Sequence, residues 1–427
     1  MERYYHLFTD KFLTGNAASH AFRWTSGGGM VDLGTLGGTN STATGISADG
    51  LVVVGHAQTG SATRAFRWTQ GTGMQSVEDW LRDATVNVPV DITFQAIAAN
   101  SDGSVVVGEL ARVANAGSGL VTLQDVQESL AGTANGGSMA LSSGNLLING
   151  AHSRPLSRRV AVGQRTFWLA GDWGQDDHGS RDGDLGLAEI GFGKNLGTVQ
   201  LNVSLGQTWA NQKQVLNGRT HSDGTYLLVE GLIPVSGNLW ATLSGYHHWS
   251  EADMKRGYLN AGTPDFSNGS PDAKTWGLRA RLEWDNAWHV GETDFAPYVD
   301  LTYSKARLAA YTETGGGFPA HFDSRDEKAT EIRVGANATK ALASGMHLIG
   351  IVEASHRFEK HGAGASGQVI GLFSFDLNGQ QNKQDWLRAG VGLEGKLAGG
   401  KGSLMLNATT QGEAPNAWLA AQWQKAF

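Results

Sequence analysis

Residues 199–209 read VQLNVSLGQTW, and their apolar and polar side chains alternate from Val199 to Leu205. A period of two is typical of a β-strand, because successive side chains of a strand point to opposite faces. The same alternation recurs in four later segments: 275–284, 295–304, 331–339 and 403–409. Each segment therefore has one apolar and one polar face. Alternation alone does not say whether the apolar face meets a protein core or lipid.

The placement of aromatic residues favours lipid. Trp276 and Trp284 lie on the apolar face of one segment, eight residues apart. At ~3.3 Å per residue and a tilt of roughly 40°, they would be ~20 Å apart along a barrel axis. This spacing is close to the height of the apolar band between the two aromatic girdles of an outer-membrane barrel. Phe295 and Tyr303 repeat the spacing.

The strand count and the connection lengths support a barrel. We predict twelve strands, near residues 160–174, 184–194, 198–209, 223–235, 238–250, 273–286, 294–307, 328–341, 346–359, 384–396, 402–410 and 417–427. Connections after even-numbered strands are short, and those after odd-numbered strands are mostly longer, as in outer-membrane barrels. The predicted fold class is all-β, with a twelve-stranded antiparallel transmembrane β-barrel. Because the strand count is even, the chain should enter and leave the barrel on the same, periplasmic, side.

Composition excludes several classes of protein. The 427 residues include no cysteine, so disulfide frameworks and cysteine–zinc sites are excluded. The net charge of −7 gives no basic footprint for nucleic acid. No apolar run is long enough for a transmembrane helix. The first residues, MERYYHLFTDKF, lack the apolar core of a secretory signal, so we expect either a longer precursor or a mis-assigned start.

The N-terminal third contains internal repeats. The sequence AFRWT at 21–25 recurs at 65–69, and SADGLVVVG at 47–55 resembles NSDGSVVVG at 100–108. Repeats of this period predict stacked or radially arranged β-units. Asp-Gly before an apolar run is a hairpin signal, so each unit should contain at least two strands. The sequence from Ala18 to Leu110 resembles the HAF-type extracellular repeats of bacterial surface proteins.

Residues 111–156 differ from both flanking regions because they are mainly small and polar. Five residues fit one face of a helix: Leu120, Leu123, Val126, Gln127 and Leu130. Gly136-Gly137 should break this helix, and 141–149 could form another. Such a segment suits passage through a narrow lumen, although a solvated linker is the alternative. The inward-facing residues expected to line the lumen are Arg279, Arg281, Glu283, Asp300, Glu331 and Arg333.

The whole chain resembles the autotransporter (type V secretion) family, which has a passenger, a helical linker and a C-terminal translocator barrel. The corresponding regions are 1–110 with HAF-type repeats, 111–156 as a linker helix in the lumen, and 157–427 as the barrel. The resemblance implies a monomeric barrel in the bacterial outer membrane that exports and anchors its passenger at the cell surface, with adhesion as a candidate role. It also implies contacts with outer-membrane lipid, periplasmic chaperones and the barrel-assembly machinery.

The resemblance extends to particular residues. Leu419, Ala421, Trp423 and Phe427 share one face of the last strand and resemble the signal read by the barrel-assembly machinery. Lys425 departs from that pattern, since the family often has an aromatic residue there. Some members cut their own linker inside the pore, which makes Asn145 and Asn149 the candidate cleavage region. The paired asparagines of that subgroup are absent.

No motif indicates an enzyme. The sequence contains no Gly-x-Ser-x-Gly nucleophile motif, and we expect no catalytic residue, cofactor or metal. Two other functions remain open at the level of sequence. One is an outer-membrane pore or structural barrel that exports nothing, and the other is a soluble surface repeat protein with a C-terminal sandwich.

Overall fold

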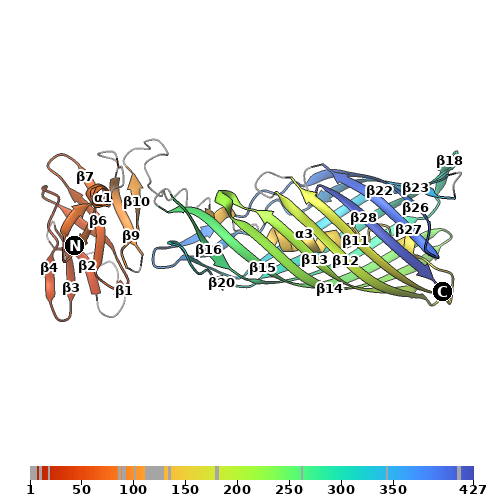
Figure 1. Ribbon diagram of the computed structural model, residues 1–427, viewed down its shortest axis with the longest axis horizontal. Coiled ribbons are helices and arrows are strands. Elements are labelled where there is room, and N and C mark those ends of the chain that lie inside the picture. The colour runs from red at the N-terminus through yellow and green to blue at the C-terminus, as the bar shows by residue number, and fades with distance from the viewer. Residues whose placement is uncertain are drawn as a thin grey trace.

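Twelve antiparallel strands of the computed structural model form one closed barrel, which confirms the predicted fold (Figure 1). They are β11 (Arg165–Asp176), β12 (Gly183–Asn195), β13 (Gln200–Lys213), β14 (Arg219–Ser236), β15 (Leu239–Asn260), β17 (Asp272–Trp284), β19 (Thr293–Leu308), β22 (Arg325–Ala341), β23 (His347–Arg357), β26 (Asp385–Leu397), β27 (Gly400–Thr409) and β28 (Ala417–Ala426). The last strand, β28, pairs with the first, β11. Closure satisfies backbone groups that would otherwise form open edges.

The structure describes residues 7–8, 12–17, 20–84, 88, 93–100, 102–110, 129–132, 136–177, 182–260, 263–342, 345–410 and 415–427. Within these residues, no helix combines the length and the apolar character needed to cross a membrane. The barrel lies toward one end of the long axis, and the small N-terminal sheets lie toward the other (Figure 1).

The barrel wall is apolar outside and polar inside. Along β17, exposed and buried residues alternate without interruption. Leu278 and Leu282 are 57% and 47% exposed, whereas Arg279 and Arg281 are 2% and 3% exposed. A soluble sheet would show the reverse arrangement, with its apolar residues buried. The exposed apolar wall is therefore the surface that faces lipid.

The two barrel ends differ in their connections. At the end with short turns, the first and last strands meet: the Phe427 N–H donates to the Arg165 carbonyl at 2.9 Å, and the Arg165 N–H donates to the Phe427 carbonyl at 2.8 Å. At the other end, long connections form additional strands. These are β16 (Thr263–Gly269), β20 (Tyr311–Thr312), β21 (Ala320–Phe322), β24 (Ala365–Val369) and β25 (Phe373–Leu377), while β18 (Trp288–Val290) belongs to the short-turn end. The long connections mark the extracellular end of the barrel.

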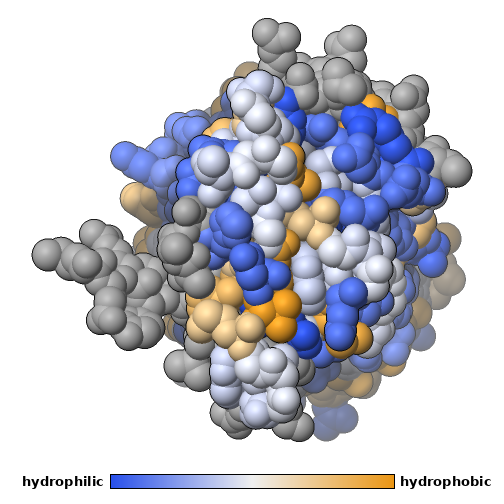
Figure 2. Space-filling model, turned by 90° about the vertical axis from the view of Figure 1, so that its left-hand side faces the viewer, coloured by the Kyte–Doolittle hydropathy of each residue, from blue (hydrophilic) through white to orange (hydrophobic). Residues whose placement is uncertain are grey.

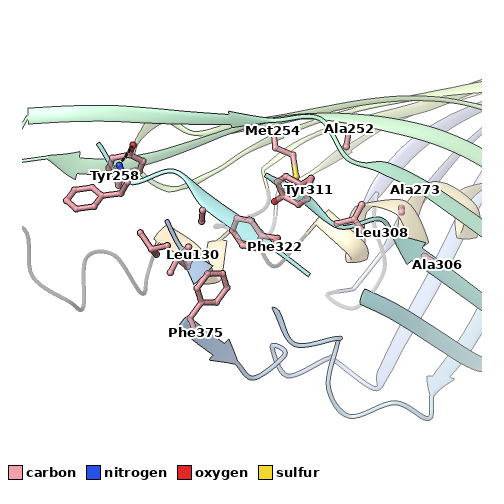
Figure 3. Close-up of a cluster of buried hydrophobic side chains, with 14 of the residues drawn as sticks. Leu130, Ala252, Met254, Tyr258, Ala273, Ala306, Leu308, Tyr311, Phe322 and Phe375 are labelled. Carbon is pink, nitrogen blue, oxygen red and sulfur yellow. Dashed lines mark hydrogen bonds between the residues drawn. The ribbon is translucent and has the colours of Figure 1, made fainter. Parts of the chain in front are cut away.

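Aromatic side chains order the extracellular connections, for which sequence analysis predicted only loops. The rings of Tyr311 and Phe322 stack with their centroids 4.9 Å apart, and Phe322 meets Phe375 edge to face at 5.3 Å (Figure 3). Leu130 of the linker packs into the same cluster. Strands β20, β21, β24 and β25 form one small sheet around it. Each of these strands has two to five residues, which is too short for an alternation of apolar and polar residues to reveal it in the sequence.

Asp265 of β16 ties two extracellular connections together. Its carboxylate accepts hydrogen bonds from the Gly317 N–H at 2.8 Å and the Asn260 amide at 3.0 Å. Burial by itself raises the pKa of Asp265, but hydrogen bonds from the backbone of Gly317 and Phe266 outweigh it, and the pKa lies below its ordinary value. The charged carboxylate is therefore the form that stabilises this connection.

Helix α3 (Gly136–Asn149) lies inside the barrel and is followed by a 3₁₀ turn, η1 (Pro155–Arg158) (Figure 1). The helix begins at Gly136 rather than at the predicted Leu141. Gly136-Gly137 therefore starts α3, and the predicted helical face at 120–127 lies outside the described residues. Gly144 allows the helix to approach the wall, because a Cβ atom there would come within 2.5 Å of the Tyr246 hydroxyl. A second short 3₁₀ turn, η2 (Val215–Asn217), joins β13 to β14.

The N-terminal repeats of sequence fold as repeats of structure. Both AFRWT copies lie in strands, β3 (His20–Thr25) and β7 (Thr63–Thr69), and each forms a hairpin with the next strand, β4 (Gly29–Asp32) or β8 (Gly73–Ser76). The Asp-Gly turns join β5 (Ser41–Ile46) to β6 (Val52–Gln58) and β9 (Thr93–Ala99) to β10 (Val106–Leu110). Both turn glycines have positive φ, 71° at Gly50 and 69° at Gly103. The remaining elements are β1 (Leu7–Phe8), β2 (Phe12–Ala17) and α1 (Val77–Asp83).

Equivalent arginines connect each repeat to the next. The Arg23 Nε donates to the carbonyl of Gly50 at 2.9 Å, and the Arg67 Nε donates to the carbonyl of Gly103 at 3.2 Å. The Arg67 guanidinium also lies 4.9 Å from the ring of Trp80. Each arginine belongs to an AFRWT strand and each acceptor to an Asp-Gly turn. The two sequence motifs of the repeat are therefore the two halves of one contact.

We expect Arg67→Ala to destabilise the repeat region by about 2 kcal/mol, because a charge-assisted hydrogen bond and a cation–π contact are lost together. The measurement is the rate of limited proteolysis of residues 20–110 in the full-length protein, which should rise about thirtyfold. Leu51→Ala is the control, since Leu51 is 58% exposed and a surface substitution of this kind changes stability little. Equal digestion rates for the two variants would contradict the interpretation.

Candidate functional site

The six residues predicted to line the lumen all point inward. Their exposed fractions are 4% or less, and they are Arg279, Arg281, Glu283, Asp300, Glu331 and Arg333. The structure joins five of them in three ion pairs: Arg281 with Glu283 at 3.0 Å and with Asp300 at 3.5 Å, and Arg333 with Glu331 at 2.7 Å. Arg333 also contacts Glu353 at 2.9 Å. These charges come from four adjacent strands, β17, β19, β22 and β23, and neutralise one another across the inner wall.

A second buried group, missed in the sequence, is centred on Glu189 of β12. Its carboxylate accepts hydrogen bonds from the Trp168 indole at 2.7 Å and the Tyr226 hydroxyl at 2.8 Å. It also contacts His152 at 3.0 Å and Arg158 at 3.3 Å. His152 lies in the linker, and Arg158 ends η1, the turn through which the linker continues toward β11. Glu189 therefore holds the linker and three barrel strands together.

The barrel wall binds the C-terminus of α3. The last four carbonyls of a helix have no partner within it. Here the Leu146 carbonyl accepts from Gly150 at 2.7 Å, and the Leu147 carbonyl from the His152 N–H at 3.3 Å. The Ile148 carbonyl accepts from Arg279 at 3.2 Å, and the Asn149 carbonyl from Arg388 at 2.7 Å. All four carbonyls are satisfied, and two cations lie at the negative end of the helix dipole.

Further bonds fix the linker below the helix. Arg279 donates to the His152 carbonyl at 2.8 Å, and Arg281 donates to the Ser153 carbonyl at 3.0 Å. The Ser157 carbonyl accepts from two side chains that are directly opposite each other on adjacent strands, Lys401 at 2.9 Å and Gln424 at 2.8 Å. These donors belong to strands β17, β27 and β28. The linker is thus part of the folded barrel, and it fills the lumen.

The two candidate cleavage residues have different surroundings. The Asn145 side-chain amide donates to Glu331 at 3.4 Å. Asn149 is 6% exposed, and its carbonyl is bound by Arg388. The residue that follows it, Gly150, lies against Asp172, whose carboxylate would be 2.5 Å from an added Cβ atom. Charged side chains therefore surround the Asn149–Gly150 bond on more than one side.

The four residues of the proposed assembly signal lie on the outer face of β28. Leu419 and Phe427 are 40% and 59% exposed. The Trp423 ring meets Phe167 edge to face at 6.4 Å. Ala421 lies between them on the same face, whereas Trp418 points inward and is 2% exposed. Lys425 also points outward.

The described part of the chain contains no group of three or more histidine, aspartate or glutamate side chains placed to hold a metal ion. The lumen carboxylates of Glu189, Glu230, Glu283 and Glu353 are instead paired with arginines.

Comparisons with known proteins concern the barrel. A family profile described as Autotransporter beta-domain matches residues 166–409. A search of curated proteins finds no match. The translocator domain of autotransporter NalP from Neisseria meningitidis is similar in structure, with 12% identity, coverage of 70% of this chain and 99% of that chain, and a TM-score of 0.54. This likeness supports the barrel fold.

Two further solved structures have lower scores. The beta domain of the Bordetella autotransporter BrkA has 13% identity, covers 62% of this chain and 100% of its own, and has a TM-score of 0.44. The toluene transporter TbuX from Ralstonia pickettii has 11% identity, covers 66% of this chain and 93% of its own, and has a TM-score of 0.45. Both TM-scores lie below 0.5, and the assignment of the barrel fold does not rest on them.

Proposed function

Because the chain belongs to the autotransporter family, whose barrels lie in the bacterial outer membrane, we propose that its barrel exports and anchors the N-terminal repeats at the cell surface. The observation that carries this proposal is the linker held inside the lumen. The linker ends at the short-turn end of the lumen, just before Arg165. From there, α3 extends back through the lumen toward the extracellular end (Figure 1). There Val107 of the repeats packs in one cluster with Leu130 and the extracellular residue Phe318. The described residues on both sides of 111–128 therefore lie at the extracellular end, as passage of the chain through the lumen requires.

The surface of the repeats fits exposure to water. Figure 2 shows the end of the molecule that carries them, where hydrophilic and neutral side chains predominate and hydrophobic areas are small. The filled lumen argues against the alternative of an open pore. The adhesive role implied by the family resemblance stays a prediction, and binding of repeat-bearing cells to host surfaces would test it.

Protease treatment of intact cells tests the export proposal. We expect the repeats at 20–110 to be digested, while a fragment that contains α3 and the barrel survives, because the wall shields the linker. Cells with a permeabilised outer membrane serve as the control and should give the same fragment. Repeats that resist protease on intact cells and are digested only after permeabilisation would contradict export.

For linker cleavage, the geometry favours Asn149 over Asn145. If the Asn149 side-chain nitrogen attacks its own carbonyl carbon, Arg388 is placed to stabilise the oxyanion that forms. The bond to Gly150 then breaks, Gly150 leaves as a protonated amine, and Asn149 becomes a C-terminal succinimide. A fragment beginning at Gly150, present in untreated cells and abolished by Asn149→Ala but not by Asn145→Ala, is the expected result. A gel that shows only full-length protein for the unaltered chain and for both variants would refute cleavage.

We also propose that the barrel-assembly machinery reads the outer face of β28. Phe427→Ser should lower the amount of protein in the outer membrane several-fold, because the terminal aromatic residue is lost from that face. Phe358→Ser is the control, since Phe358 is 53% exposed at the other barrel end. Refolding of the purified variants in detergent should be equal, which separates recognition from stability. Equal membrane levels of the two variants would contradict this role.

A further inference from the structure

Four cations lie together on the outer wall at the extracellular end of three adjacent strands. They are Lys274 of β17, Lys305 and Arg307 of β19, and Lys328 of β22. Lys274 is directly opposite Arg307, and Lys305 is directly opposite Lys328. We name these four residues the cationic patch. Lys274, Arg307 and Lys328 are exposed, and Lys305 is half-buried.

The patch borders the aromatic girdle. Trp276 is the next outward residue after Lys274, and Tyr303 is the outward residue before Lys305. The two rings are in contact, with centroids 5.4 Å apart. Aromatic residues of this kind mark the level of lipid headgroups. Below them the exposed wall is apolar, as at Leu278, which is 57% exposed.

Charge within the patch is only partly balanced by the protein. Like charges directly opposite each other on paired strands are destabilising. Asp326 is directly opposite Arg307 and forms an ion pair with Lys305 at 2.7 Å, so one carboxylate serves four cations. Within the described residues, Lys274, Arg307 and Lys328 have no acidic side chain in ion-pair contact. The nearest acidic cross-strand pair, Glu251 with Asp272, lies one row farther from the membrane. An external anion would therefore relieve the repulsion between these cations.

We propose that the cationic patch binds the phosphate groups of a phosphorylated glycolipid in the outer leaflet. Arginine and lysine are suited to phosphate, and basic clusters beside a membrane recognise anionic headgroups. A lipid is favoured over free phosphate because the apolar wall beneath the patch continues the same surface and would contact acyl chains. The inference depends on placement in the outer membrane but not on export of the repeats.

The test measures binding of diphosphorylated lipid A to the full-length protein in detergent, by lipid retained after gel filtration. The triple variant Lys274→Gln/Arg307→Gln/Lys328→Gln should bind about a hundredfold more weakly, since each cation near a headgroup contributes about a fivefold factor. The matched control removes three exposed cations at the periplasmic end: Lys194→Gln/Lys340→Gln/Lys396→Gln. It should bind as the unaltered protein does.

Two other ligands identify the source of the phosphate. Enzymatically dephosphorylated lipid A should not be retained, and millimolar inorganic phosphate should not compete. Equal retention of the dephosphorylated lipid, equal binding by both triple variants, or full competition by inorganic phosphate would each overturn the proposal. Heat-dependent migration on gels verifies that each barrel is folded. If the triple variant does not fold, Lys274→Gln alone should still weaken binding about fivefold.

Discussion

Truncating the chain to residues 154–427 is expected to raise its conductance in a planar bilayer at least about tenfold, because a helix with its side chains occupies a cylinder about 10 Å wide. In the full-length protein α3 is held in the lumen by Arg279 and Arg388 at its C-terminus. Ser129 adds a contact near the other end, where its hydroxyl donates to the Gly257 carbonyl at 2.8 Å. With the helix removed, the remaining wall is polar and open to water.

Point variants separate plugging from the loss of the repeats. Arg279→Gln/Arg388→Gln should leave the chain full-length but produce intermittent openings, since both substitutions weaken the hold on the helix carbonyls. Arg219→Gln, on the outer wall, is the matched control and should conduct as little as the unaltered protein. A truncated barrel that conducts no more than the full chain would show that α3 does not close the lumen.

Glu189→Ala is expected to lower the free energy of unfolding by about 3–5 kcal/mol, the usual cost of leaving a buried charge without its partner. The substitution removes the acceptor for Trp168 and Tyr226 and leaves the linker residue Arg158 facing a cavity. Both side chains of the Arg158–Glu189 ion pair are fully buried. Because no water reaches them, solvent cannot replace the lost interactions.

Denaturant unfolding of the full-length protein in detergent measures this loss of stability. Glu251→Ala is the control, because Glu251 points outward and is exposed; a surface change of this kind should alter stability by less than about 0.5 kcal/mol. Glu189→Ala should also make the linker more sensitive to protease. If the two variants unfold at the same denaturant concentration, the group around Glu189 does not hold the linker in place.

The barrel could be predicted almost completely because its strands are long and face lipid on one side only. The strand predicted at 273–286 is β17, Asp272–Trp284, and the one predicted at 417–427 is β28, Ala417–Ala426. By contrast, the strand predicted to end at residue 250 continues to Asn260 as β15. That extension lies beyond the membrane, where packing of Tyr258 against Phe318 replaces the lipid-facing pattern.

The lumen could be predicted only in part. Arg279 and Arg333 could be found because inward residues of a strand alternate with lipid-facing ones. Glu189 obeys the same rule, and a full listing of inward positions would have found it. His152 and Arg158 could not be found in this way, since the linker has no periodicity that relates it to the wall. Their roles depend on tertiary contacts between the linker and distant strands.

The central claim is that apolar residues of the strands face lipid while polar residues face a lumen filled by the linker. The chain has no cysteine, so single cysteines can be introduced cleanly. Leu278→Cys points to lipid, and Ser304→Cys points into the lumen, where Ser304 is 3% exposed. In membranes, a water-soluble maleimide should label neither cysteine in the full chain and only Ser304→Cys in the chain truncated to 154–427. Labelling of Leu278→Cys in either chain, or no labelling of Ser304→Cys after truncation, would contradict the account.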